Sequence, residues 1–339
     1  MLLTSSQSKS VTLALQGGGS HGAFTWGVLD RLLEDERLEI EGISGASAGA
    51  MNALVLANGF MAGGRDGARL ALRTFWESVA NRAPFSHLPE FASAATAGNT
   101  QGKVSPSVRA SLRMLRYFSA RQLNPLDLNP LRDLLLEQID FEQIRTRCPI
   151  KLYVAATAVQ SGRLKLFENA ELSVDAMLAS ACLPFFNQAV EIDGVAYWDG
   201  GFTANPPLFP LIDACAARDL VAVVLQPLER SEIPTKPEDI RERLTEISLA
   251  APFFTELQRV ATAQLHAERR GTGERRVNKL KIHLIDSQQL MSQLGALSKL
   301  NAHPTFISRL FDNGRERADL WLNEHFSAIG RQSSWQLAA

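Results

Sequence analysis

The 339-residue sequence has only three cysteines, Cys148, Cys182 and Cys215, and they are far apart. An odd number of widely spaced cysteines without a C-x-x-C pair argues against a disulfide framework or a zinc site and is typical of thiols in a reducing compartment. No run of 18 or more apolar residues occurs, so no membrane-spanning helix is predicted. The first ten residues lack the basic and apolar regions of a signal peptide. We therefore expect a cytoplasmic protein and leave peripheral contact with a membrane surface open.

Charge and composition also exclude some partners. Lysine and arginine number 35 against 36 acidic residues, which gives a net charge of −1, so a nucleic-acid partner is not expected. Apolar residues make up 45% and charged residues 21% of the chain, as in ordinary globular proteins. We expect one large domain over residues 11–330 between polar tails at residues 1–10 and 331–339, and the oligomeric state stays open.

A short motif around Ser47 indicates a nucleophile. Gly45-Ala46-Ser47-Ala48-Gly49 is a G-x-S-x-G pattern that follows a predicted strand at residues 38–44 and opens a predicted helix. Small residues on both sides of such a serine let strand and helix approach closely and leave the hydroxyl exposed at the helix N-terminus. A tightly packed strand–helix turn without a catalytic role would have the same composition, so the motif needs support from elsewhere in the chain.

Three consecutive glycines precede this motif. Gly17-Gly18-Gly19-Ser20-His21-Gly22 follows a strand-like segment at residues 11–16 and leads into a helical pattern. Consecutive glycines leave main-chain N–H groups unshielded, so the loop can point several donors at the oxyanion of an acyl transfer. The N–H of Ala48, directly after Ser47, would be a further donor. The glycine spacing also fits a dinucleotide-binding loop, with Glu39 or Glu41 near the acidic position, but that alternative leaves the Ser47 motif unexplained.

Asp199 is the candidate base. It follows a predicted hairpin at residues 190–198, which turns at Asp193-Gly194, and it precedes Gly200 and Gly201. An aspartate before glycine often only caps its own turn. A serine, however, needs a base to become a nucleophile, and a desolvated carboxylate can take its proton without help from histidine.

Together the three segments resemble the patatin-like phospholipases, lipid acyl hydrolases with a serine–aspartate dyad. The resemblance rests on Gly17-Gly18-Gly19-x-x-Gly22, Gly45-x-Ser47-x-Gly49 and Asp199-Gly200-Gly201, in the family's order, and covers about residues 11–225, with further similarity at residues 129–132 and 179–184. It implies Ser47 as nucleophile, Asp199 as base and residues 17–19 as the oxyanion hole. It also implies a lipid ester as substrate and a reaction that requires neither a metal ion nor a cofactor.

One position departs from the family pattern. His21 stands where family members often carry arginine or lysine, so the charge beside the glycine loop would depend on pH. We expect this histidine to be an exposed loop residue.

The order of elements predicts an α/β fold. Strand and helix patterns alternate over the first 80 residues, with a glycine-rich break at residues 59–67. This favours a three-layer, patatin-like architecture with a mostly parallel central sheet flanked by helices. Further strands are predicted at residues 151–159, 164–168, 220–225 and 279–285, and helices at residues 131–139, 246–265 and 305–326. Residues 84–107 are predicted as a loop and residues 107–121 as a helix with an arginine edge, and both could form a lid.

Two alternatives stay open. The order Ser47, Asp199 and then His283 or His303 would allow a Ser–Asp–His esterase or thioesterase of the α/β-hydrolase type, although His283 lies inside an alternating strand pattern. The second alternative is a catalytically silent module that binds a lipid or a partner. Such a module would not require a nucleophile, a base and a glycine loop at the same time. A carboxylate base predicts activity that persists below about pH 6, whereas a fall with an apparent pKa near 6.5 would indicate histidine.

Overall fold

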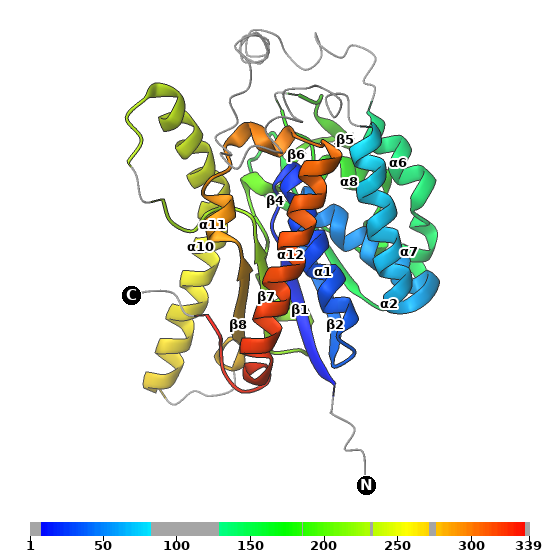
Figure 1. Ribbon diagram of the computed structural model, residues 1–339. Coiled ribbons are helices and arrows are strands. Elements are labelled where there is room, and N and C mark those ends of the chain that lie inside the picture. Colours follow the sequence, from blue (N-terminus) through cyan, green and yellow to red (C-terminus); the bar gives the residue numbers. More distant parts are fainter. Residues whose placement is uncertain (1–7, 83–128, 185, 231–232, 271–275, 336–339) are drawn as a thin grey trace.

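The computed structural model describes residues 8–82, 129–184, 186–230, 233–270 and 276–335. These residues form an eight-stranded mixed sheet with the strand order β5-β6-β3-β2-β1-β7-β8, and β4 pairs with β3 beside this path (Figure 1). Pairs among β3, β2, β1, β7 and β8 are parallel, whereas β4, β5 and β6 pair antiparallel. The strands are β1 (Lys9–Leu15), β2 (Leu38–Ala46), β3 (Lys151–Ala158), β4 (Leu164–Glu168), β5 (Val190–Ile192), β6 (Val195–Asp199), β7 (Asp219–Val224) and β8 (Lys281–Asp286).

Helices cover both faces of this sheet. In Figure 1, α12 passes in front of β1 and α10 lies to the left of β8. The α-helices are α1 (Gly22–Glu34), α2 (Ala48–Arg82), α6 (Pro130–Gln138), α7 (Phe141–Arg147), α8 (Val174–Ser180), α9 (Phe209–Ala214), α10 (Pro237–Arg270), α11 (Gln288–Met291) and α12 (Pro304–His325). Short 3-10 helices are η1 (Gly19–His21), η2 (Asn169–Glu171), η3 (Gly200–Phe202), η4 (Arg276–Lys279), η5 (Ala296–Leu300) and η6 (Phe326–Ala328).

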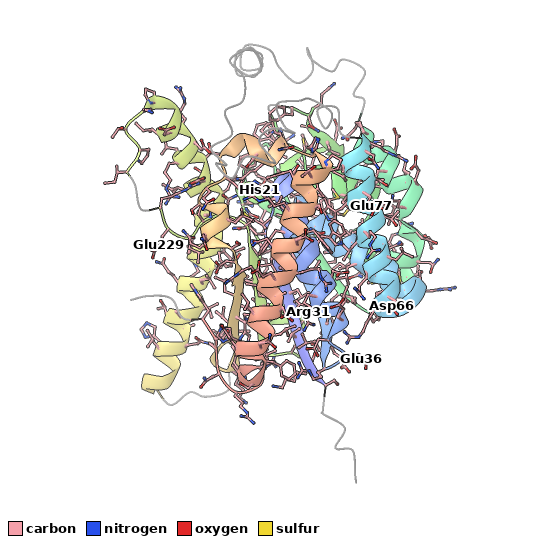
Figure 2. The ribbon with its side chains drawn as sticks, in the orientation of Figure 1. His21, Arg31, Glu36, Asp66, Glu77 and Glu229 are labelled. Carbon is pink, nitrogen blue, oxygen red and sulfur yellow. The ribbon has the colours of Figure 1, made fainter. Side chains whose placement is uncertain are left out.

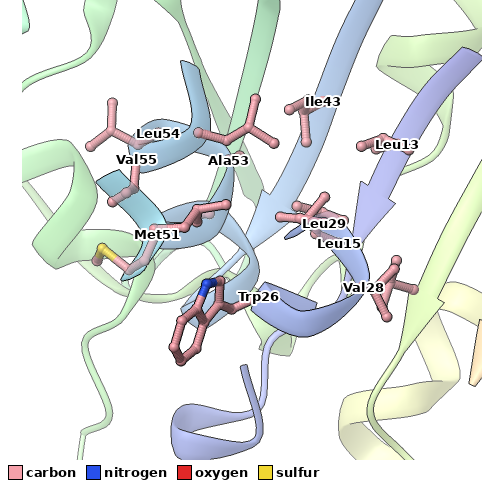
Figure 3. Packing of buried hydrophobic residues seen from close by; sticks show 14 of the residues in the cluster. Leu13, Leu15, Trp26, Val28, Leu29, Ile43, Met51, Ala53, Leu54 and Val55 are labelled. Atoms are coloured by element: carbon pink, nitrogen blue, oxygen red, sulfur yellow. The ribbon is translucent and has the colours of Figure 1, made fainter. Parts of the chain in front are cut away.

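Alternate residues of the buried strands face opposite layers. Val221 and Val223 of β7 join the core formed with α1, α2 and α12, whereas Leu220 and Ala222 join the core formed with α9 and α10. Figure 3 shows part of the first core, which includes Leu13 and Leu15 of β1 and Val28 and Leu29 of α1. A strand buried on both faces is apolar at nearly every position, which is why β7 is a continuous hydrophobic run. The predicted three-layer α/β fold is thus confirmed.

The glycine-rich break predicted at residues 59–67 is confirmed. The range α2 (Ala48–Arg82) consists of two helical segments separated by a kink at Gly63 and Gly64, whose backbone angles are not helical. Gly59 and Gly67 pack together across this kink, because a Cβ added at either would overlap the carbonyl oxygen of the other. The helix predicted at residues 131–139 is confirmed as α6, where the side chain of Asn129 caps the first turn by accepting from Leu131 N. The loop predicted at residues 84–107 and the helix predicted at residues 107–121 lie outside the described residues.

Part of the predicted C-terminal tail lies along the edge strand. Ser333 Oγ accepts from the N–H of Ile282 in β8 at 3.1 Å, and the N–H of Trp335 donates to the carbonyl of Ile282 at 3.2 Å. These contacts cover backbone groups of an edge strand. Among the described residues, no helix is long and apolar enough to cross a membrane.

Candidate active site

The register of the sheet places the ends of β2 and β6, which are far apart in the sequence, at the same position along β3. Ala46, the last residue of β2, pairs with Ala155 of β3. On the other side of β3, Ala156 pairs with Asp199, the last residue of β6. Ser47 follows Ala46 directly, so Ser47 and Asp199 meet at the carboxyl end of β2. Open α/β sheets hold their ligands at this edge.

Ser47 occupies a strained turn between β2 and α2. Its φ of 52° lies in the left-handed region, which residues other than glycine rarely adopt. The N–H of Ser47 donates to Ser180 Oγ at 3.0 Å, and Ser47 is partly exposed between two buried alanines. The turn depends on small neighbours, because a Cβ added at Gly49 would overlap the carbonyl oxygen of Leu15. Close packing therefore holds the serine in the partly exposed, strained position that is typical of a nucleophile turn.

Asp199 is a buried carboxylate beside this serine. It is 4% exposed, and its Oδ1 accepts the N–H of Gly201 at 2.7 Å. Burial raises the pKa of Asp199 to about 6, although hydrogen bonds from Gly201 and the Ser47 hydroxyl and the charge of Lys299 act to lower it. A carboxylate with a pKa close to neutral pH is a suitable acceptor for a serine proton.

The raised pKa of Asp199 changes one expectation. An ordinary aspartate would stay ionised well below pH 6, and activity there was predicted as the sign of a carboxylate base. With a pKa of about 6, Asp199 becomes protonated in nearly the range where histidine does. A pH profile alone therefore does not distinguish the two kinds of base, and substitution of the carboxylate is needed.

The glycine loop, residues 17–19, lies next to Ser47. The N–H of Gly17 already has a hydrogen-bond acceptor, because it donates to Asn205 Oδ1 at 2.7 Å. This contact removes Gly17 from the predicted oxyanion donors and leaves the N–H groups of Gly18, Gly19 and Ala48. Gly19 has a φ of 58°, a conformation that favours glycine.

Two buried asparagines, Asn205 and Asn52, brace the glycine loop and the helix that follows Ser47. Asn205 also donates to the carbonyl of Leu249 in α10 at 3.2 Å, so it ties the glycine loop to that helix. Asn52 donates to the carbonyl of Gly22 at 3.0 Å and accepts from Trp76 Nε1 at 2.9 Å. Sequence reasoning missed both residues, although an asparagine inside the apolar helix pattern of residues 48–57 was a visible signal.

His21 differs from its prediction. It is 2% exposed, not a surface residue, and its Nε2 shares a hydrogen bond of 2.8 Å with Ser298 Oγ. Burial, together with the nearby charge of Lys299, lowers the pKa of His21 to about 3. Figure 2 shows His21 at the end of the sheet where α12 begins. The histidine is thus neutral at physiological pH and does not give the loop a pH-dependent charge.

The histidines proposed for a triad lie in other contacts. His283 Nε2 bonds with Asp219 Oδ1 at 3.0 Å, and its Nδ1 bonds with Ser334 Oγ at 2.9 Å. His303 caps α12 by accepting from Thr305 N. None of these contacts involves the Ser47 and Asp199 pair, so the geometry does not support a Ser–Asp–His triad. Within the described ranges, no group of His, Cys, Asp and Glu side chains could hold a metal ion.

A comparison with models of protein families agrees with the motifs. The family model of the patatin-like phospholipases matches residues 13–212. The crystal structure of VipD from Legionella pneumophila is similar over 94% of this chain and 67% of its own, with 16% identity and a TM-score of 0.40. The ExoU–SpcU complex from the type III secretion system of Pseudomonas aeruginosa is similar over 74% of this chain, with 20% identity and a TM-score of 0.31. This chain spans only 52% of that second relative. No curated protein matches the sequence.

Proposed function

The chain belongs to the patatin-like phospholipase family, and we propose that it hydrolyses carboxylic acyl esters of lipids with Ser47 as nucleophile and Asp199 as general base. One observation carries this proposal. A partly exposed serine in a strained strand–helix turn has a hydrogen bond with a buried carboxylate whose pKa is raised. Such a pair can supply a nucleophile and its base without histidine.

The first half of the reaction acylates the serine. Asp199 accepts the hydroxyl proton of Ser47 while Ser47 Oγ forms a bond with the acyl carbonyl carbon. The carbonyl oxygen becomes an oxyanion that accepts hydrogen bonds from the N–H groups of Gly18, Gly19 and Ala48. Loss of one such donor typically raises the activation barrier by about 2.7–4 kcal/mol. The intermediate collapses as Asp199 gives the proton to the departing alcohol oxygen, and the acyl group stays on Ser47.

The second half releases the acid. Asp199 takes a proton from water, the water oxygen attacks the acyl carbonyl carbon, and the proton returns to Ser47 Oγ as the ester bond breaks. The substrate class is a lipid ester, which is met at the surface of a membrane or another lipid aggregate. We therefore include peripheral contact with a lipid surface in the proposal.

Fluorophosphonate labelling tests this function directly. We expect the label on Ser47, identified by peptide mass, and turnover of a short-chain ester and of phospholipid vesicles. Ser47→Ala should abolish both, and Asp199→Asn should reduce turnover by about 10²-fold or more, the usual contribution of a general base. Ser161→Ala, at an exposed serine in the β3–β4 turn, is the matched control and should retain both. Label on another serine, or full turnover by Asp199→Asn, would contradict the proposal, and lipid binding without turnover would favour a binding module.

A further inference from the structure

A lysine from outside the family-matched residues 13–212 approaches the candidate site. Lys299 belongs to η5, which packs against η1 at the end of the glycine loop. A Cβ added at Gly19 would overlap the carbonyl oxygen of Lys299, so the two backbones are in close contact. The neighbouring Ser298 bonds with His21 at 2.8 Å. The backbone of Lys299 is thereby fixed to the segment that holds the candidate oxyanion donors.

Charged groups from three segments of the chain act on the Lys299 side chain. Glu246 and Glu242 come from α10, Arg230 from the segment after β7, and Asp199 from the end of β6. Burial lowers the pKa of Lys299, and so does Arg230, whereas Glu246, Glu242 and Asp199 raise it. Glu246 is itself 6% exposed and ion-paired with two arginines, one of them Arg230. The positive charge of Lys299 is therefore not needed to neutralise Glu246.

Asp199 differs from Glu246 in its charged partners. Among the described residues, no arginine or lysine forms an ion pair with Asp199, and Lys299 is the charged side chain that lowers its pKa. His21 is kept neutral by burial and by Lys299. Positive charge behind the glycine loop therefore comes from η5 and not from the loop itself.

We propose that Lys299 is a positioning residue for the reaction, whose ammonium group supplies positive potential beside Asp199 and where the oxyanion forms. The inference rests on the proposed roles of Ser47 and Asp199. The charge acts through the base and through the glycine loop, without contact between Lys299 and the lipid. A headgroup phosphate site fits less well, because three carboxylates already act on this ammonium group.

The test removes the charge and keeps the side-chain length. In Lys299→Met, Asp199 should hold its proton to higher pH, so the acid limb of kcat/KM and of the Ser47 labelling rate should move upward. An opposite charge within several ångströms shifts a carboxyl pKa by about 1–3 units, and we expect a shift on the order of one unit or less. At about pH 6 the variant should lose kcat with little change in KM. Lys299→Arg should restore the wild-type profile, and Lys236→Met, at an exposed lysine, should not change it.

A second measurement is independent of activity. The carboxyl carbon of Asp199 can be titrated by NMR in aspartate-labelled protein, with Asp199→Asn identifying the signal and circular dichroism confirming the fold. The same titration midpoint in wild type and in Lys299→Met would overturn the inference even if the enzyme were active. A shifted midpoint in a protein that labels no serine would instead support the coupling and refute the proposed function. Lys299→Gln provides the same test if Lys299→Met does not fold.

Discussion

Ionisation of Asp199 should destabilise the folded protein, and the size of the effect follows from its burial. The pKa of Asp199 is raised from 3.8 to about 6, so the folded chain binds this proton more tightly than the unfolded chain. Stability from this group is present below about pH 4 and is lost as pH rises through about 6. A difference of roughly two pKa units corresponds to about 3 kcal/mol of unfolding free energy. The residue proposed as base therefore costs stability at the pH where it works.

Asp199→Asn isolates this contribution. Urea unfolding at about pH 4.5 and pH 8 should show the variant gaining about 2 kcal/mol relative to wild type between the two values, because most of the titration lies in this interval. The comparison with the variant is necessary because His21, whose pKa is lowered to about 3, has the opposite effect and loses stability as pH falls. Asp66→Asn is the matched control, since the Asp66 side chain is 97% exposed.

The outcome that would refute this reasoning is specific. If Asp199→Asn and wild type show parallel stability profiles from about pH 4.5 to pH 8, the folded pKa of Asp199 is ordinary. The carboxylate would then not be desolvated, and the argument that burial prepares it as a base would fail. A parallel loss of turnover in the variant would not rescue that argument.

Three further predictions concern the packing around the site. Asn205→Ala should leave the buried N–H of Gly17 without its hydrogen-bond acceptor and so lower the unfolding free energy by about 1–3 kcal/mol, as measured by urea unfolding. It should also lower kcat for ester turnover, and an unchanged kcat would contradict the bracing role. Gly49→Ala should yield little folded protein, because its Cβ would overlap the carbonyl of Leu15, and a wild-type yield and circular dichroism spectrum would refute this. Trp76→Phe should lower the unfolding free energy by about 1 kcal/mol, because it removes the hydrogen bond from Trp76 to buried Asn52. An unchanged unfolding free energy would contradict this prediction.

Local sequence was enough where a few adjacent residues fix the backbone. The hairpin before Asp199 was predictable because a two-residue turn needs left-handed conformations at both positions, and Asp193 and Gly194 have φ values of 51° and 77°. The turn at Ser47 was predictable because only small residues allow a strand and a helix to meet so closely. Alternation of strand and helix patterns indicated the parallel sheet.

Tertiary structure decided the chemistry around these residues. Whether Asp199 lies beside Ser47 depends on the register between β3 and β6, which pairs segments about 40 residues apart. The same packing buries His21, which the sequence placed on the surface, and raises the pKa of Asp199. It also brings Lys299 to the glycine loop from the far end of the chain. The sequence determined which groups are available, and long-range packing set their charge, because desolvation and electrostatic interactions depend on neighbours that no local pattern specifies.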